Sequence, residues 1–162
     1  MSEPAPRFWE VFFEVFKALP RQGPGSRAST ARALELCRDL PSSPSVLDLG
    51  CGTGAQTIHL AELTSGFIVA IDHHAPSIER LRETVADLGL AHRIRPRVGD
   101  IADPHEPPGS FDLVWSEGAL YNLGLERALP ICRDLLRPRG YLGFTDAIWR
   151  KENAPRAAAR RR

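Results

Sequence analysis

The sequence lacks the features that mark metal-binding, disulfide-rich and membrane proteins. It holds only three cysteines, Cys37, Cys51 and Cys132, and none has the two-residue spacing of a zinc or redox pair. Three cysteines cannot all pair with one another, which favours a reducing compartment, so we expect a cytoplasmic protein. No apolar run reaches the roughly 18 residues of a membrane span, and no basic and then apolar leader opens the chain. We therefore expect no metal, no signal peptide and no membrane span.

An excess of charge of one sign is also missing. The formal net charge is +1 at pH 7, so no strong field toward nucleic acid or an acidic membrane is implied, and we expect neither as a partner. Residues 150–162 are the exception, with six Lys or Arg against one Glu, which leaves the rest mildly acidic. A basic tail can contact nucleic acid or acidic lipid, but we interpret residues 150–162 as a basic, disordered tail and residues 1–149 as one domain, which suits the length.

Strand-like and helix-like segments alternate after residue 40. Turn residues bound each segment, and Pro76 and Gly89 suit the first turn and the stop of one helix. This alternation predicts an α/β fold, a three-layer α/β/α sandwich with a mainly parallel sheet of about five strands. Pro96 predicts that its strand lies at a sheet edge. The predicted strands are residues 45–49, 67–71, 94–98, 111–115 and 141–145, and the predicted helices are residues 53–63, 76–89 and 125–136.

Two more helices are expected before the sheet. Residues 8–19 have apolar side chains at helical spacing, and Ser29 or Thr30 can cap a second helix that reaches about residue 40. Residues 1–40 then either cover one face of the sheet or act as a lid, with Gly25 and Ser26 as candidates to approach a ligand.

The run D-L-G-C-G-T-G at residues 48–54 joins a predicted strand to a predicted helix. Such a loop lets backbone N–H groups approach a ligand at the carboxyl ends of the strands. Gly50, Gly52 and Ala55 also fit the dinucleotide pattern, so a nicotinamide-dependent oxidoreductase is one alternative. Asp48 favours S-adenosylmethionine instead, because a carboxylate would repel a pyrophosphate and attract an ammonium and a sulfonium. Opposite charges about 4 Å apart attract by about 4 kcal/mol at a partly screened site, before desolvation costs.

Further candidate residues follow the other strands. Asp72, about 20 residues past the loop, can accept both ribose hydroxyls, and Asp100 can accept from an adenine amino group. Either aspartate can instead cap a turn, and His73 either helps to position the cofactor or is an exposed loop residue. Glu117 is the candidate general base beside the expected methyl group, unless its segment only orders the loop. The predicted cofactor-binding residues are Asp48, Gly50, Cys51, Gly52, Gly54, Asp72, His73, Asp100, Ile101 and Ser116; the predicted substrate-binding residues are Tyr121 and Asn122.

Five segments carry a family resemblance: VLDLGCGTG (46–54), VAID (69–72), GD (99–100), FDLVWSEG (111–118) and LLRPRGYL (135–142). Together they resemble class I S-adenosylmethionine-dependent methyltransferases, in the branch similar to ubiquinone and menaquinone methyltransferases. The resemblance spans about residues 25–149 and implies a Rossmann-like fold that transfers a methyl group to a small-molecule acceptor by direct displacement. It implies contacts from the glycine loop to the methionine part of the cofactor, from Asp72 to ribose and from Asp100 to adenine.

The sequence departs from the family pattern after the fifth strand. The family sheet normally closes with an antiparallel hairpin, whereas 17 residues follow Thr145 here, so we expect a C-terminally short protein without that hairpin. The fifth strand would then be an open edge with Tyr141, Leu142 and Phe144, able to pair with a second copy in a homodimer. This departure leaves an alternative function, a catalytically inactive binding module or partner subunit.

Overall fold

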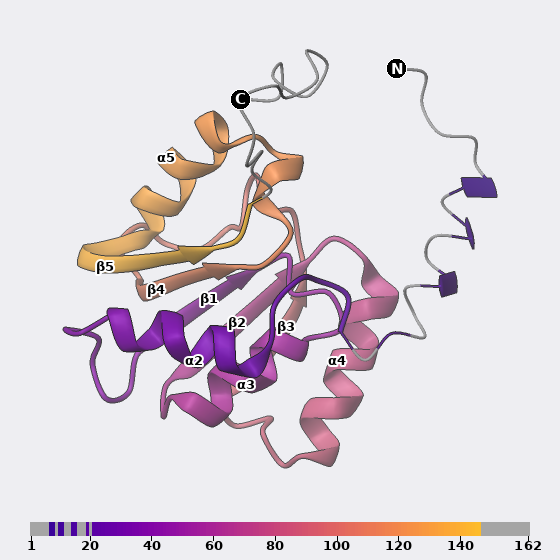
Figure 1. Cartoon of the computed structure of the whole chain (residues 1–162), viewed down its shortest axis with the longest axis horizontal. Helices are drawn as coiled ribbons and strands as arrows, with labels where there is room; N and C mark the ends of the chain where they lie inside the picture. The colour runs from indigo at the N-terminus through magenta and orange to yellow at the C-terminus, as the bar shows by residue number, and fades with distance from the viewer. Residues whose placement is uncertain (1–6, 9, 12–13, 16–18, 20, 147–162) are drawn as a thin grey trace.

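A computed structural model describes residues 7–8, 10–11, 14–15, 19 and 21–146. Five strands form one sheet in the order β3-β2-β1-β4-β5, and every neighbouring pair is parallel (Figure 1). The predicted Rossmann-like α/β fold with a five-stranded sheet is therefore confirmed. The strands are β1 (Ser45–Leu49), β2 (Phe67–Asp72), β3 (Ile94–Val98), β4 (Phe111–Ser116) and β5 (Leu136–Phe144); the helices are α2 (Arg27–Leu36), α3 (Ala55–Leu63), α4 (Ala75–Asp87), the short η1 (Leu120–Asn122) and α5 (Leu125–Leu135).

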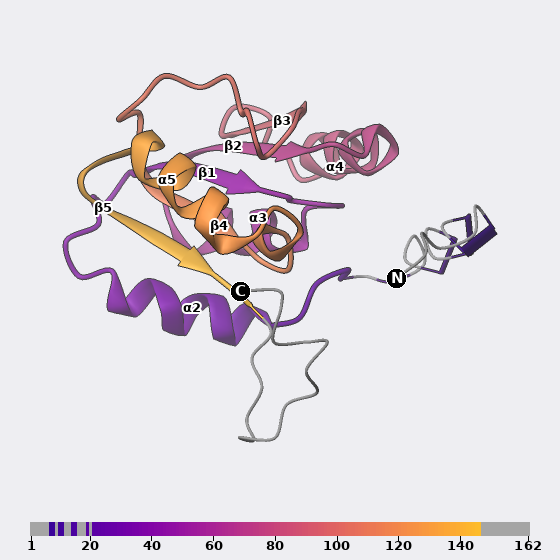
Figure 2. The same ribbon diagram turned by 90° about the horizontal axis from the view of Figure 1, so that it is seen from above.

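Helices cover both faces of the sheet, because alternate residues of each buried strand point to opposite sides. Val46 packs in a core with α3 and α4, whereas its neighbour Leu47 packs in a second core with η1 and α5. In Figure 1, α5 lies above the sheet and α2, α3 and α4 lie below it. Figure 2 shows α4 beside β2 and β3, and α2 on the side of β5.

The two edges of the sheet are β3 and β5. Pro96 lies in β3, as its lack of an N–H donor predicts. β5 begins at Leu136, earlier than predicted, because a shift in register opposite Phe111 and Leu113 takes up the expected turn at residues 138–140. No further strand pairs with β5 among residues 21–146.

The predicted boundaries of the second helix are wrong. Its N-cap is Ser26, whose hydroxyl accepts the N–H of Ser29 at 3.1 Å, and not Ser29 or Thr30. α2 also ends at Leu36, short of residue 40, because Cys37 leaves the helical conformation. Thr30 is therefore inside the helix, where its side chain is buried and its hydroxyl donates to Glu117, in the loop after β4.

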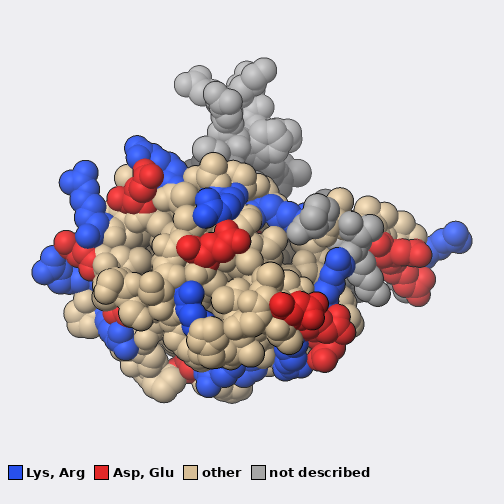
Figure 3. Space-filling view, turned by 90° about the horizontal axis from the view of Figure 1, so that it is seen from below, with Lys and Arg blue, Asp and Glu red and all other residues tan. Residues whose placement is uncertain are grey.

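Several predictions concern residues that are described only in part or not at all. In the predicted helix at residues 8–19, residues 8, 10–11 and 14–15 are helical, and the others, apart from Leu19, lie outside the described residues. The predicted tail, residues 150–162, lies outside them entirely. In the part of the chain that the structure describes, no helix is long and apolar enough to cross a membrane, and no cluster of His, Cys, Asp or Glu could hold a metal ion. On the face shown in Figure 3, basic and acidic side chains are interspersed.

Candidate functional site

The glycine loop lies at the carboxyl edge of the sheet, between β1 and α3. The backbone N–H groups of Gly50 and Cys51 donate to the carbonyl of Ile71, at 2.8 and 3.0 Å, so the loop is tied to the end of β2. Gly50 has a φ of +74°, and a Cβ there would come within 2.2 Å of the Cβ of Ala119. Glycine is therefore required for this turn, as the sequence predicted.

Asp72 connects the end of β2 with the glycine loop. Its Oδ2 accepts the N–H of Gly52 and its Oδ1 accepts the N–H of His74, both at 2.8 Å. The side chain is 12% exposed, and each carboxylate oxygen has a further lone pair for a ligand hydroxyl. The geometry fits a pair of ribose hydroxyls, and Asp72 also caps the turn into α4.

Asp48 points into the protein and not toward the open side of the loop. It is fully buried, and its Oδ2 accepts the hydroxyl of Thr57 at 2.6 Å, while the amide of Gln56 lies 3.5 Å from its Oδ1. Burial raises the pKa of Asp48 to about 7, against the opposing effect of these two hydrogen bonds. A charged carboxylate that faces the ligand was the reason for preferring S-adenosylmethionine, and the structure does not show that orientation. A contact between Asp48 and a cofactor stays a prediction.

Two other predicted residues have side chains that point into the fold. Cys51 is buried in the core beneath α3 and α4, and burial raises the pKa of its thiol well above the ordinary value. The hydroxyl of Ser116 donates to the carbonyl of Leu49 at 2.8 Å, which joins the ends of β4 and β1. Cofactor contacts from these two residues stay a prediction.

The remaining predicted residues lie nearer the surface. The side chain of His73 is 82% exposed, and Asp100 is exposed and accepts the N–H of Ala102 at 2.8 Å, as in a capped turn. Ile101 is half-buried against the core beneath α5. Tyr121 and Asn122 are exposed on η1.

Glu117 is a buried residue with three hydrogen-bond donors. Its Oε2 forms an ion pair with Arg21, and its Oε1 accepts the indole N–H of Trp115 at 2.9 Å and the hydroxyl of Thr30 at 3.2 Å. Both oxygens are thus already bonded within the protein. The role of Glu117 as a general base stays a prediction, and these contacts do not favour it.

Residues before α2 contribute side chains that sequence reasoning missed. Nη1 of Arg21 lies 3.3 Å from Nδ1 of His59 on α3, and Oε1 of Gln22 accepts the N–H of Thr53 at 3.2 Å. Burial, and then the charge of Arg21, lower the pKa of His59. A neutral His59 ring can accept a hydrogen bond from Arg21 at Nδ1. The only signal for this arrangement was the Gly- and Pro-rich run at residues 23–25, which does not identify the partners.

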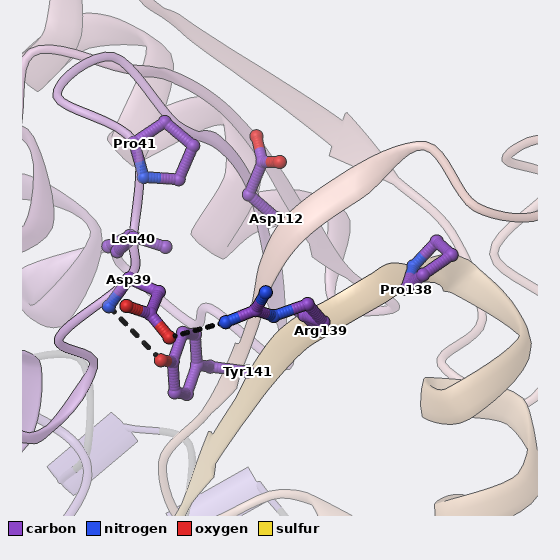
Figure 4. A pocket seen from close by; sticks show the side chains of 8 residues that line it. Asp39, Leu40, Pro41, Asp112, Pro138, Arg139 and Tyr141 are labelled. Carbon is purple, nitrogen blue, oxygen red and sulfur yellow. Dashed lines mark hydrogen bonds and ion pairs between the residues drawn. The ribbon is translucent and has the colours of Figure 1, made fainter.

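A surface pocket of about 450 Å³ lies at the opposite end of the sheet from the glycine loop, where β4 and β5 begin (Figure 4). Arg139 forms an ion pair with Asp39 at 3.0 Å there, and the N–H of Asp39 donates to the hydroxyl of Tyr141. These residues surround the beginnings of β4 and β5, whereas ligands of open α/β sheets bind at the carboxyl ends of strands. We therefore place the candidate site at the glycine loop.

The chain is similar to known methyltransferases. A family model described as "Methyltransferase domain" matches residues 46–140. Nocamycin O-methyltransferase of Saccharothrix syringae is 35% identical over 125 residues, which are 75% of this chain and 44% of that protein. Dimethylglycine N-methyltransferase of Parasynechococcus marenigrum is 32% identical over 116 residues, 71% of this chain and 41% of that protein.

Solved structures show the same fold. A SAM-dependent methyltransferase from Thiobacillus denitrificans, in complex with S-adenosyl-L-homocysteine, has a TM-score of 0.77 and 22% identity, and the match covers 99% of this chain and 62% of that one. The chain spans less than half the length of the curated relatives that it matches. On the evidence of the family model and of the sheet, the chain belongs to the methyltransferase domain family.

Proposed function

We propose that this chain binds S-adenosylmethionine at the carboxyl edge of its sheet and transfers the methyl group to a small-molecule acceptor by direct displacement. The observation that carries the proposal is the hydrogen bond from the Gly52 N–H to Asp72 Oδ2. It places a carboxylate that can accept ribose hydroxyls directly beside a loop whose backbone can approach the methionine part of the same ligand.

Different residues of the site would bind different parts of the cofactor. The backbone of Gly50, Gly52 and Gly54 would contact the methionine part, Asp72 the ribose, and Asp100 and Ile101 the adenine. The cofactor supplies the methyl group, so the protein has to align the acceptor, the methyl carbon and the sulfur, and alignment alone can contribute a large part of the rate. A general base is needed only if the acceptor must lose a proton.

Calorimetric titration of the full chain with S-adenosylmethionine, S-adenosylhomocysteine and NAD tests the proposal. We expect binding of the first two and none of NAD. Gly52→Val should abolish binding, because the added side chain would displace Gln22 Oε1, 2.6 Å from the new Cβ, and would stand on the loop surface that we propose contacts the cofactor. Gly109→Val is the matched control, since φ there is +62° and no atom lies within 4 Å of the added Cβ. Binding of NAD, or equal affinity in Gly52→Val and wild type, would contradict the assignment.

Asp48 is proposed as a cofactor residue through its charge and not through direct exposure. If the cationic ligand favours the ionised carboxylate, binding at pH 7 should release about half a proton, because the pKa of Asp48 is about 7 in the free protein. Calorimetry in buffers of different ionisation enthalpy measures this release. Asp48→Asn should bind with no proton release; the same release in both proteins would exclude the role.

The acceptor is proposed only as a class. The printed names of the relatives include both O- and N-methyltransferases, so a panel of hydroxyl and amine acceptors with labelled cofactor is the direct test. Variants of Tyr121 and Asn122 should change the KM of the acceptor if these residues bind it. A closer kinship with ubiquinone and menaquinone methyltransferases stays a proposal, and quinol-type acceptors belong in the panel. The named relatives are enzymes, which gives no support to the inactive alternative.

A homodimer through β5 is a separate proposal. β5 is an edge strand of the sheet, and Phe144 on it is 39% exposed. Light scattering after size-exclusion chromatography would show the dimer, and Phe144→Lys should shift it to monomer. A cytoplasmic location also stays a proposal; the three cysteines are unpaired in the structure, which agrees with it.

A further inference from the structure

Residues 21–25 cross the carboxyl edge of the sheet, and we name this segment the strap. Oε1 of Gln22 accepts the N–H of Thr53 in the glycine loop at 3.2 Å. A Cβ on Gly23 would lie 3.4 Å from the carbonyl oxygen of Glu117, so the strap also touches the loop after β4. The strap therefore forms one wall of the proposed cofactor site.

One ion pair fixes the beginning of the strap. Arg21 and Glu117 have side chains that are 16% and 5% exposed, so solvent and salt screen their attraction much less than that of a surface pair. Trp115 and Thr30 donate to the other oxygen of Glu117, and this holds the carboxylate in place on the body of the domain. Glu117 is thus fixed to the body of the domain, while its partner Arg21 belongs to the strap.

The strap side of the pair is less completely bonded. Nε of Arg21 is buried and has no hydrogen-bond partner among the described residues. An unpaired buried donor costs free energy, so the pair holds the strap less tightly than a fully bonded guanidinium would. A contact of this kind can hold the strap in place and still open for a ligand.

We propose that the Arg21–Glu117 pair is a clasp that positions the strap against the glycine loop and so sets the affinity for the cofactor. The inference rests on the proposed function. In it, Glu117 is a positioning residue that acts through Arg21 and the strap. Breaking the clasp frees one wall of the site, weakens cofactor binding and leaves the fold intact.

A double-mutant cycle on the full chain tests the clasp, with the Kd of S-adenosylhomocysteine measured by calorimetry. Arg21→Ala and Glu117→Gln should each raise the Kd about tenfold, and the double variant no further than either single one, because coupled residues are not additive. Glu117→Gln keeps an oxygen for Trp115 and Thr30, so this variant should fold. Arg21→Lys keeps the charge and should restore most of the affinity.

The matched control is the exposed ion pair between Arg27 and Glu62, which also joins the segment around α2 to the body. Arg27→Ala should leave the Kd unchanged, since exposed pairs contribute little. A Kd in Glu117→Gln equal to that of wild type, or additive effects of the two single variants, would overturn the clasp. If the wild-type chain itself fails to bind S-adenosylhomocysteine, the proposed function fails, and the clasp with it.

A spectroscopic readout separates positioning from general stability. The indole of Trp115 donates to Glu117, so its fluorescence should report the state of the clasp when Trp9 and Trp149 are replaced by Phe. S-Adenosylhomocysteine should change this emission in the clasped protein and much less in Arg21→Ala. An equal change in both proteins would show that the response of Trp115 to the ligand does not depend on Arg21, and this would also overturn the clasp.

Discussion

The buried carboxylate of Asp48 makes a sharp prediction about stability and pH. Its pKa in the folded protein is raised from 3.8 to about 7, chiefly by burial. A pKa that is higher in the folded than in the unfolded state means that the folded state binds the proton more tightly. Protonated Asp48 therefore stabilises the folded state. This contribution is fully present below the unfolded pKa of 3.8 and is lost as the pH rises through about 7.

The size of the effect follows from the two pKa values. A difference of about 3 corresponds to roughly 4 kcal/mol between the acid and alkaline limits, at about 1.4 kcal/mol for each pH unit. Between pH 5 and pH 7, Asp48 alone should lower the free energy of unfolding by about 2 kcal/mol. Asp48→Asn removes the titration and keeps a side chain of the same size that can bond to Thr57.

The assay is urea unfolding followed by circular dichroism at pH 5, 6, 7 and 8, for wild type and Asp48→Asn. Other titrating groups are common to both proteins, so they cancel in the difference between the two free energies of unfolding. This difference should move by about 2 kcal/mol in favour of the variant from pH 5 to pH 7 and then level off. Asp87→Asn, at an exposed carboxylate on α4, should show no such movement. Parallel pH curves for wild type and Asp48→Asn would show that the pKa of Asp48 is not raised in the folded protein.

Three further predictions concern other parts of the fold. Arg93→Ala should lower the free energy of unfolding by about 2 kcal/mol in urea melts, because the guanidinium donates to backbone carbonyls of residues 61, 64 and 66 at 2.6 to 3.1 Å; a loss no larger than for the exposed Arg127→Ala would contradict this. Gly50→Ala should lower the free energy of unfolding by about 2 kcal/mol or more, because φ is positive there and the added Cβ would clash with Ala119. An unchanged thermal midpoint would count against this loop geometry. A thiol reagent at pH 7 should modify the half-buried Cys37 in the folded chain but not the fully buried Cys51; burial raises the pKa of both thiols, so access decides between them, and mass spectrometry of the labelled peptides measures it.

The order of the elements could be predicted from the sequence because the apolar runs are bounded by glycine and proline. Residues 45–49 and 94–98 form strands with the predicted limits, and Pro96 identified an edge. Local chemistry was less decisive at the start of α2: Ser29 and Thr30 were the predicted caps, but Ser26 caps the helix, because its hydroxyl accepts the N–H of Ser29. The shifted start of β5 depends on its pairing with β4, and a single segment carries no information about its partner.

Candidate residues at the strand ends could be found from sequence, but their surroundings could not. The sequence places Asp48 before a glycine loop, and its attraction to a cationic ligand follows only on the assumption that the carboxylate is ionised and faces that ligand. That assumption depends on which face of β1 the side chain takes, and Asp48 shares its face with Val46, beneath α3. The preference for a cationic ligand that we propose for this site would therefore depend on how readily the buried proton of Asp48 leaves. A site for a cation can be built from a neutral acid that ionises on binding, and the proton-release experiment measures that cost directly.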